Sequence, residues 1–413
     1  MSGIYIHVPF CKQACTYCDF YFETSRKHRA GFVQALKQEM AWEAAHTGRL
    51  QEEIVETVYL GGGTPSVLTP AEIHDILETL RSLARISGTA EITMEMNPDD
   101  VQPHRLSELM AAGINRFSMG VQTFNEERLR FMNRAHSRQE ALTALSALAA
   151  SGCRSWTADL IYGNPGQPET DLLEDVETML RFNPPHVSAY SLTVEPRTRL
   201  GSMVRKKLVR PAEDDLVSRH MNLIMQRFRQ AGLERYETSN YAWPGHESRH
   251  NGAYWQHINY LGLGPSAHSF WWETGDGSRA PSAGLRWRNL PKLGDYITQD
   301  YDADGEPEFR EEAERLSLHE LAEERLLIGL RTRPGVGIGE LMQRYGYRFS
   351  ASQRQFLIRM QEQGYIIIQA CEPAGNTSPA ADREPLSAAA AITLSETGMM
   401  MADYLALELI SRG

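Results

Sequence analysis

Short apolar segments alternate with longer segments of helical spacing over the first two-thirds of the chain. In the longer segments apolar side chains recur every three to four residues, which is typical of a helix with one buried face. The short segments are rich in residues that favour strands. The pattern predicts strands at Ile4–Val8, Ile54–Leu60, Ala90–Met96, Arg116–Val121, Ser155–Ile161 and His186–Leu192, and helices at Ala30–Ala45, Ala71–Ala84, Arg105–Ala112, Gln139–Ala150 and Glu169–Phe182.

This alternation predicts an α/β fold with a parallel sheet, because a helix between two strands returns the chain to the same edge of the sheet. The repeated units are too few to close an eight-stranded barrel, so we expect an open, partial (β/α)6 barrel. In such a barrel the loops that follow the carboxyl ends of the strands form the active face.

The remainder of the chain predicts an extension of this barrel and a further domain. We expect residues 1–200 to form the partial barrel and residues 201–305, which are irregular and rich in aromatic residues, to extend it. Within the extension, Gly275–Gly284 predicts a loop. Residues 306–413 predict a winged-helix-like α+β domain, with helices at Ala322–Leu330, Gln353–Gln363 and Gly398–Ile410 and strands at Tyr365–Gln369 and Ile392–Leu394.

Composition narrows the classes of function. The net charge of −11 over 413 residues argues against a general nucleic-acid binder, which needs an excess of Lys and Arg. The first residues lack the basic and apolar regions of a secretory signal, and no apolar stretch approaches the ~18 residues that a membrane span needs. We therefore expect a cytoplasmic protein.

Three of the five cysteines, Cys11, Cys15 and Cys18, follow the first predicted strand directly. Clustered cysteines in a cytoplasmic chain favour a metal or redox site over a disulfide framework. Thiolates are ligands for iron–sulfur clusters, zinc and copper(I), and three of them can bind a cubane cluster while leaving one iron open. A zinc site completed by a distant His, and cysteines without a metal, are the alternatives. Cys153 and Cys371 are remote in sequence and are interpreted as structural.

Other suggestive residues follow the next predicted strands. The sequence GGGTP occupies Gly61–Pro65, Glu95–Pro98 follows the third strand, Gly120–Gln122 the fourth and Asp159–Gly163 the fifth. Because the carboxyl ends of parallel strands lie at one edge, we expect these segments to meet. Glycines, which lack Cβ, let a ligand approach the backbone closely.

The spacing C-x3-C-x2-C, with an aromatic residue before the third cysteine, resembles the radical S-adenosylmethionine (SAM) superfamily. This resemblance implies a [4Fe-4S] cluster on Cys11, Cys15 and Cys18, with the amino and carboxylate groups of SAM on the open iron. The flanking Tyr5–Phe10 and Asp19–Phe20 resemble the branch that contains oxygen-independent coproporphyrinogen III oxidase and the HemW haem chaperones, and the likeness covers nearly the whole chain.

The resemblance also implies residues that hold SAM. Glu95 is expected to bind the SAM amine or a ribose hydroxyl, and Asp159 a ribose. For each carboxylate a solvated or ion-paired strand end is the alternative. The oxidase accommodates two SAM molecules, so some positions can belong to a second site. The complete implied set is Tyr5, Tyr17, Gly62, Gly63, Thr64, Glu95, Gln122, Arg134, Asp159 and Thr193.

Two features separate the oxidase from the chaperones. Phe20 stands where the oxidase has a fourth cysteine, which disfavours porphyrinogen oxidation. The segment Arg249–Trp255 matches the H-N-x-x-Y-W motif of the HemW group, whose His is implicated in haem binding and is His250 here. A neutral imidazole is a common axial ligand of haem iron. A histidine packed in the core is the alternative for His250.

The resemblance implies a haem chaperone on a radical SAM scaffold that binds haem and delivers it to membrane respiratory haem proteins. Its cofactors are the [4Fe-4S] cluster, SAM and haem, and no catalytic side chain is assigned. Peripheral membrane association and a homodimer are compatible with this interpretation. The alternative function is a radical SAM enzyme that acts on a porphyrinogen.

Overall fold

Twelve strands form one continuous sheet in the computed structural model, which describes residues 1–413 except 275–279, 302–306, 308, 371–385 and 387. The strand order is β12-β11-β10-β9-β1-β2-β3-β4-β5-β6-β8-β7. Neighbours from β9 through β1 to β6 pair in parallel, and the strands at both edges pair antiparallel. Cys371 lies outside the described residues.

All six predicted strands and all five predicted helices are present, with ends shifted by a few residues. Capping boxes at Thr69–Glu72 and Ser137–Glu140 begin two of the helices, because each hydroxyl accepts a hydrogen bond from the backbone three residues on. The strands are β1 (Ser2–Val8), β2 (Val55–Gly62), β3 (Ile86–Met96), β4 (Arg116–Gln122), β5 (Ser155–Tyr162) and β6 (His186–Ser191). The helices are α1 (Arg29–His46), α3 (Pro70–Leu83), α4 (Pro103–Ala112), α6 (Arg138–Ala150) and α7 (Glu169–Leu180), with short α2 (Arg49–Glu52) and α5 (Glu126–Phe131) between them.

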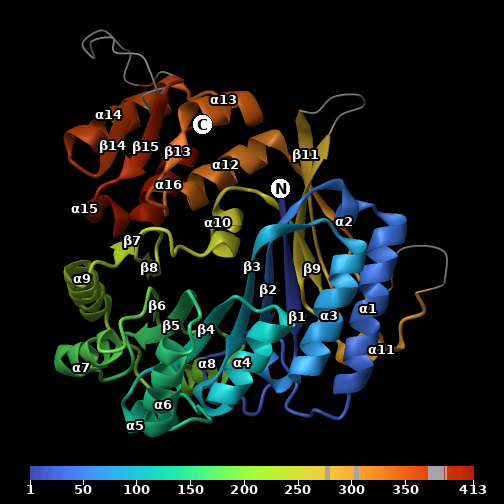
Figure 1. Ribbon diagram of the computed structural model, residues 1–413. Coiled ribbons are helices and arrows are strands. Elements are labelled where there is room, and N and C mark those ends of the chain that lie inside the picture. Colours follow the sequence, from blue (N-terminus) through green and yellow to red (C-terminus); the bar gives the residue numbers. More distant parts are fainter. Residues whose placement is uncertain (275–279, 302–306, 308, 371–385, 387) are drawn as a thin grey trace.

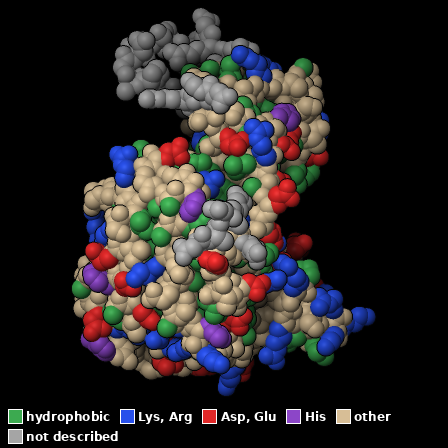
Figure 2. Space-filling view, turned by 90° about the vertical axis from the view of Figure 1, so that its right-hand side faces the viewer, with side chains coloured by type: hydrophobic (Ala, Val, Ile, Leu, Met, Phe, Trp, Pro, Cys, Tyr) green, Lys and Arg blue, Asp and Glu red, His purple; other side chains and the backbone are tan. Residues whose placement is uncertain are grey.

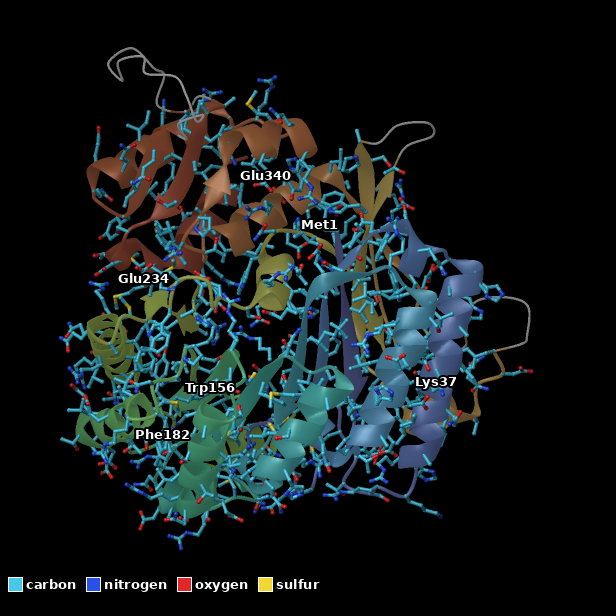
Figure 3. All side chains as sticks on the ribbon, viewed as in Figure 1. Met1, Lys37, Trp156, Phe182, Glu234 and Glu340 are labelled. Atoms are coloured by element: carbon cyan, nitrogen blue, oxygen red, sulfur yellow. The ribbon has the colours of Figure 1, made fainter. Side chains whose placement is uncertain are left out.

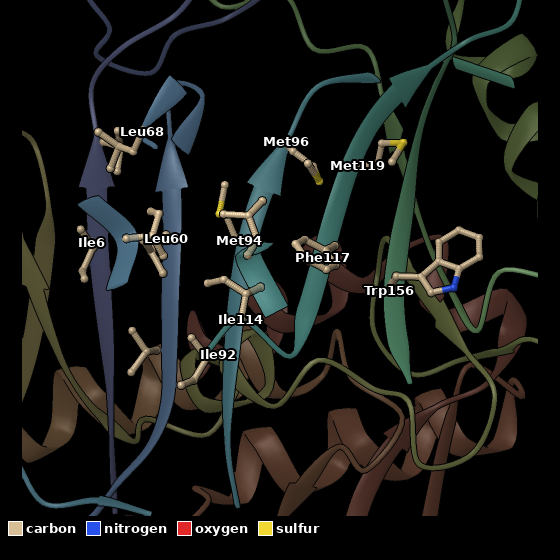
Figure 4. Close-up of a cluster of buried hydrophobic side chains, with 14 of the residues drawn as sticks. Ile6, Leu60, Leu68, Ile92, Met94, Met96, Ile114, Phe117, Met119 and Trp156 are labelled. Carbon is tan, nitrogen blue, oxygen red and sulfur yellow. The ribbon is translucent and has the colours of Figure 1, made fainter. Parts of the chain in front are cut away.

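Side chains alternate between the two faces of these parallel strands, as the period of two requires. Leu60 on β2 and Met94 on β3 belong to the main hydrophobic core, on the side that the helices cover (Figures 1 and 4). At the alternate positions of these strands, Tyr59 on β2, Glu95 on β3 and Asp159 on β5 line a cavity. The apolar face therefore holds the helices on the sheet and leaves the inner face for chemistry, which confirms the predicted partial barrel.

Residues 199–298 are more regular than expected. They form α8 (Arg199–Arg205), α9 (Asp214–Gln230), β7 (Glu234–Arg235), β8 (Asn240–Ala242), α10 (Arg249–Trp255), β9 (Asn259–Leu263), β10 (His268–Thr274), β11 (Pro281–Arg288) and α11 (Leu293–Thr298). Strand β9 was not predicted, and it adds a parallel strand beside β1.

The loop predicted for Gly275–Gly284 is wrong in its second part, because Pro281–Gly284 begin β11. Residues 275–279 lie outside the described chain. Packing within the sheet, and not a turn, requires a glycine at position 284, because a Cβ there would lie 2.8 Å from the Phe270 ring.

The C-terminal residues form an α+β unit around a three-stranded antiparallel sheet of order β13-β15-β14. Phe270 and Trp272 of β10 share its hydrophobic core, so the unit packs directly on the sheet extension. Figure 1 shows it above the barrel, with α10 between the two. Its elements are β12 (Glu314–Ser317), α12 (Leu318–Gly329), β13 (Val336–Gly337), α13 (Ile338–Arg344), α14 (Ala351–Glu362), β14 (Ile366–Ala370), β15 (Ala390–Leu394), α15 (Glu396–Met399) and α16 (Ala402–Ile410).

One detail of this unit differs from expectation. The helix predicted at Gly398–Ile410 is divided into α15 and α16. The domain bounds at residues 200 and 305 stay predictions.

Ion pairs tie neighbouring elements together. Lys37 on α1 lies 2.8 Å from the Asp75 carboxylate on α3, and Glu340 on α13 lies 3.0 Å from Arg325 on α12 (Figure 3). Acidic and basic side chains intermingle on the face in Figure 2. Across the described ranges, no helix has the length and apolar character needed to cross a membrane.

Candidate cofactor site

A cavity of about 640 Å³ opens at the carboxyl ends of the parallel strands. The alternation of side chains along each strand aims polar groups into it. It collects every predicted cluster and SAM residue except Tyr5: Cys11, Cys15, Tyr17, Cys18, Gly62, Gly63, Thr64, Glu95, Gln122, Arg134, Asp159 and Thr193. The predicted haem residue His250 is also absent from its lining.

The three clustered cysteines are half-buried free thiols on the loop after β1. Burial raises the pKa of the Cys11 thiol, and it raises the pKa of Cys18 to about 11. Half-buried thiolates need positive charge close by to offset their desolvation, and the iron of a bound cluster would supply it. Within the described residues, no three His, Cys, Asp or Glu side chains converge on a point that would hold a single metal ion. All three thiols line the cavity, and three thiolates can bind three irons of a cubane cluster.

Two side chains fasten the cysteine loop to the strand ends. Arg134 Nη1 donates to Cys15 Sγ at 3.4 Å, and Thr64 Oγ1 donates to Cys11 Sγ at 3.7 Å. Arg134 Nη2 also donates to the Asn97 side chain at 2.6 Å, and Asn97 Nδ2 donates to Thr64 Oγ1 at 3.1 Å. This network places N–H and O–H donors beside two of the thiols, where they stabilise negative charge on sulfur.

The glycine-rich turn owes its composition to chain packing. Gly62 has φ +104°, and a Cβ there would lie 2.6 Å from the His7 ring. A Cβ on Gly63 would lie 2.7 Å from the Phe10 carbonyl oxygen. The expectation that the missing Cβ atoms make room for a ligand is therefore corrected, because the chain itself fills those spaces. The turn still lines the cavity, and its Gly62 N–H donates to Glu95 Oε2 at 3.1 Å.

Glu95 and Asp159 are partly exposed residues whose carboxyl groups are strongly desolvated in the cavity wall. Desolvation raises the pKa of Glu95 to about 7 and that of Asp159 to about 7. Asp159 Oδ1 and Gln122 Oε1 have no hydrogen-bond partner among the described residues, and such atoms cost about 1–3 kcal/mol each. Unpaired buried acceptors beside raised-pKa carboxyls fit a ligand with cationic and hydroxyl groups, as SAM has.

Tyr59 is the main site residue that was not predicted from the sequence. Its hydroxyl donates to Glu95 Oε1 at 2.8 Å, and its ring stacks on His250 with centroids 5.1 Å apart. The alternation within β2 could have found it, because Val58 and Leu60 belong to the core. Ser118 and Tyr190 line the cavity and were also missed.

Tyr5 and His250 lie behind Tyr59. Tyr5 stacks on Tyr59 with centroids 6.2 Å apart, and its hydroxyl lies 3.1 Å from His7 Nδ1. His250 is buried, and its Nδ1 and Nε2 lie 2.8 Å from the Thr57 and Tyr254 hydroxyls respectively. Ligation of haem iron by His250 Nε2 would therefore require the Tyr254 hydrogen bond to break, and the ligand role stays a prediction.

A second cavity, of about 660 Å³, holds the rest of the H-N-x-x-Y-W motif. Tyr254 and Trp255 line it together with Asn251, and Tyr190 lines both cavities. Burial lowers the pKa of His257, another lining residue, to about 3. The remaining walls come from Glu237, Thr238, Ser239, Asn240, Tyr260, Phe270, Arg286, Glu324, Ile328, Arg331 and Asp403.

Comparison with known proteins gives the family. The family sequence model of the radical SAM superfamily matches residues 5–179 of this chain. The chain is 38% identical over 271 residues to the heme chaperone HemW of Escherichia coli (strain K12), across 64% of this chain and 69% of that protein. It is 32% identical over 369 residues to the heme chaperone HemW of Bacillus subtilis (strain 168), across 89% and 93%. The chain belongs to the HemW family.

HemW-family membership within the radical SAM superfamily implies a [4Fe-4S] cluster and SAM as cofactors. The solved coproporphyrinogen III oxidase (HemN) of Escherichia coli has the same fold, with a TM-score of 0.76 over 99% of this chain and 90% of that one at 20% identity. That structure extends the likeness of fold from the barrel to the C-terminal unit. The residues that hold the cofactors remain predictions from the motif and from the cavity that collects them.

Proposed function

We propose that this HemW-family protein is a haem chaperone that binds haem through the segment 250–255 and carries a SAM-ligated [4Fe-4S] cluster. The observation that carries the proposal is a cavity of about 660 Å³ lined by Tyr254 and Trp255 of the motif, in a family whose named members are heme chaperones. The aromatic side chains supply the flat apolar walls that a porphyrin needs. His250 fixes the Tyr254 hydroxyl through a 2.8 Å hydrogen bond.

Cys11, Cys15 and Cys18 hold the cluster in this proposal. The cluster supplies an open iron that binds SAM and can pass it one electron. Glu95 and Asp159 bind the amine and ribose, and desolvation of the two carboxyl groups strengthens these contacts. Tyr5 acts indirectly, through its packing on Tyr59. The other proposed SAM contacts are Tyr17, Gly62, Gly63, Thr64, Gln122, Arg134 and Thr193, all in the cavity wall.

A protein that delivers haem to membrane respiratory haem proteins must contact the cytoplasmic surface of the membrane. The segment 205–210, with sequence RKKLVR, carries four basic side chains and exposes Leu208 by 71%. Basic residues around an apolar one bind anionic lipid surfaces, even in a protein of net negative charge. The preceding helix α8 is fastened to the cysteine loop, because Leu200 N–H donates to the Thr16 carbonyl at 2.8 Å. Membrane contact would thus occur beside the cofactor cavity. A homodimer is compatible with this arrangement.

A haemin titration of the cluster-containing protein tests the proposal. We expect stoichiometric binding, seen as a shifted Soret band, and no conversion of coproporphyrinogen III in the presence of SAM and a reductant. Phe20 replaces the fourth cysteine of the oxidase and lines the cofactor cavity, in line with the absence of that reaction. Absence of stoichiometric haemin binding together with formation of protoporphyrinogen IX would establish the porphyrinogen enzyme instead.

A further inference from the structure

The cavity beside the motif is closed by two parts of the chain. Tyr254 and Trp255 on α10 and Phe270 on β10 contribute aromatic rings, and Ile328 on α12 and Arg331 just after that helix close it from the C-terminal unit. Aromatic walls of this kind fit a planar macrocycle.

The guanidinium groups of Arg286 and Arg331 belong to residues that line the same cavity. Arg286 is held by Glu324 at 2.7 Å and Arg331 by Asp403 at 2.6 Å. A guanidinium has five N–H donors, so each can still meet a carboxylate of a ligand. Glu237, Glu324 and Asp403 also line the cavity, so the aromatic walls, and not its net charge, are what fit a porphyrin.

Two histidines near this cavity differ in the state of their ring nitrogens. Both nitrogens of His250 are engaged by hydroxyl groups, and the residue does not line the cavity. His257 lines it, is 4% exposed, and has a buried Nε2 without a hydrogen-bond partner among the described residues. The nearest acidic oxygen, on Glu324, is 4.0 Å from that nitrogen, which is too far for a hydrogen bond.

The rest of His257 is held firmly. Its Nδ1 lies 3.0 Å from the Tyr345 hydroxyl, and its carbonyl oxygen accepts from Trp272 Nε1 at 2.6 Å and from Arg344 Nη2 at 2.7 Å. The backbone has φ +50°, a left-handed conformation that is uncommon for residues other than glycine. Strain of this kind persists where surrounding contacts over-determine it, and it is concentrated at functional sites.

We propose that His257 Nε2, rather than His250, is the nitrogen that binds iron when haem occupies this cavity. Metal-binding histidines usually have their other ring nitrogen fixed by a hydrogen bond, as Tyr345 fixes Nδ1 of His257. The inference rests on the proposed haem-chaperone function and assigns its binding site. Because Tyr345 and Arg344 belong to the C-terminal unit, that unit orients the ligand as well as closing the cavity.

The test is a haemin titration of the full-length protein and the variants His257→Gly, His250→Ala and His246→Ala. Difference spectra against each haemin-free protein separate the haem bands from those of the cluster. Glycine suits the positive φ at position 257, so this variant is expected to fold, and thermal unfolding checks that it does. His246, a half-buried histidine of the same segment that is absent from the cavity lining, is the matched control.

We expect His257→Gly to lose the spectrum of nitrogen-ligated haem and to bind haemin at least tenfold more weakly. Added imidazole should restore the spectrum by filling the vacated space. His250→Ala should keep nitrogen ligation at saturating haemin, and His246→Ala should match the wild type. If His257→Gly keeps the wild-type spectrum and affinity, or if His250→Ala alone loses ligation, the assignment is wrong while the chaperone function stands. If the wild type binds no haemin, the proposed function itself fails.

Discussion

Replacement of Asp159 by asparagine should stabilise the protein without its ligands and weaken its binding of SAM. The carboxyl group is buried at the end of β5, and Oδ1 has no hydrogen-bond partner in the described structure. Burial raises its pKa from 3.8 to about 7. This difference corresponds to about 4 kcal/mol against the ionised form in the folded chain. Asparagine has the same shape and avoids this cost.

The sign of the effect follows from proton linkage. Between pH 3.8 and about 7 the unfolded chain releases the proton of Asp159 while the folded chain retains it, so the wild type loses stability as pH rises through this window. Asp159→Asn lacks this loss. Compared with the wild type, its free energy of unfolding should be higher by about 2 kcal/mol at about pH 5 and by about 4 kcal/mol at about pH 8.

Urea unfolding of the cofactor-free protein across this pH range measures the first effect, and calorimetric titration of SAM into the cluster-containing protein measures the second. Loss of a hydrogen bond from a charged group is worth about 1.5–3 kcal/mol, so we expect SAM affinity to fall by about tenfold or more. Asp19→Asn is the control, because Asp19 lines the same cavity but is exposed.

Equal pH dependence in Asp159→Asn and the wild type would refute the argument from buried charge. Unchanged SAM affinity would remove Asp159 from the proposed site even if the variant proved more stable. Gain of stability together with loss of binding is the signature of a carboxyl group that is kept for its ligand.

Further predictions concern the cluster and the membrane. Cys11→Ser should abolish the broad visible iron–sulfur absorbance, and unchanged absorbance and iron content would disprove the cluster assignment. Arg134→Gln should lower the cluster midpoint potential in an EPR-monitored redox titration, because it removes positive charge beside a cluster thiol; an unchanged or higher potential would contradict this role. Charge reversal at Lys206 and Lys207 should weaken binding to anionic vesicles about 30-fold or more, at about 1 kcal/mol for each lysine, and equal sedimentation of variant and wild type would exclude the basic segment.

The strand–helix order could be predicted from the sequence because each element buries a continuous apolar face. Val58 and Leu60 identify β2, and the capping boxes at Thr69–Glu72 and Ser137–Glu140 fix where two helices begin. The cysteine cluster could be recognised for the same reason, since its ligands are close in sequence. β9 could not be predicted securely, because it is short and its pairing with β1 joins residues more than two hundred positions apart.

The sequence by itself determined the alternation of strands and helices in the barrel, the cluster motif and the strand ends that meet at one cavity, because periodicity and local spacing encode them. Only the tertiary structure decided which buried polar atoms lack a hydrogen-bond partner. His250 and His257 are two histidines of one segment, yet Thr57 and Tyr254 engage both nitrogens of the first, while Nε2 of the second has no hydrogen-bond partner in the described chain. Likewise Glu95 and Asp159 have raised pKa values because distant elements bury them. Burial and hydrogen bonding depend on contacts between residues far apart in the chain, and no local pattern specifies those contacts.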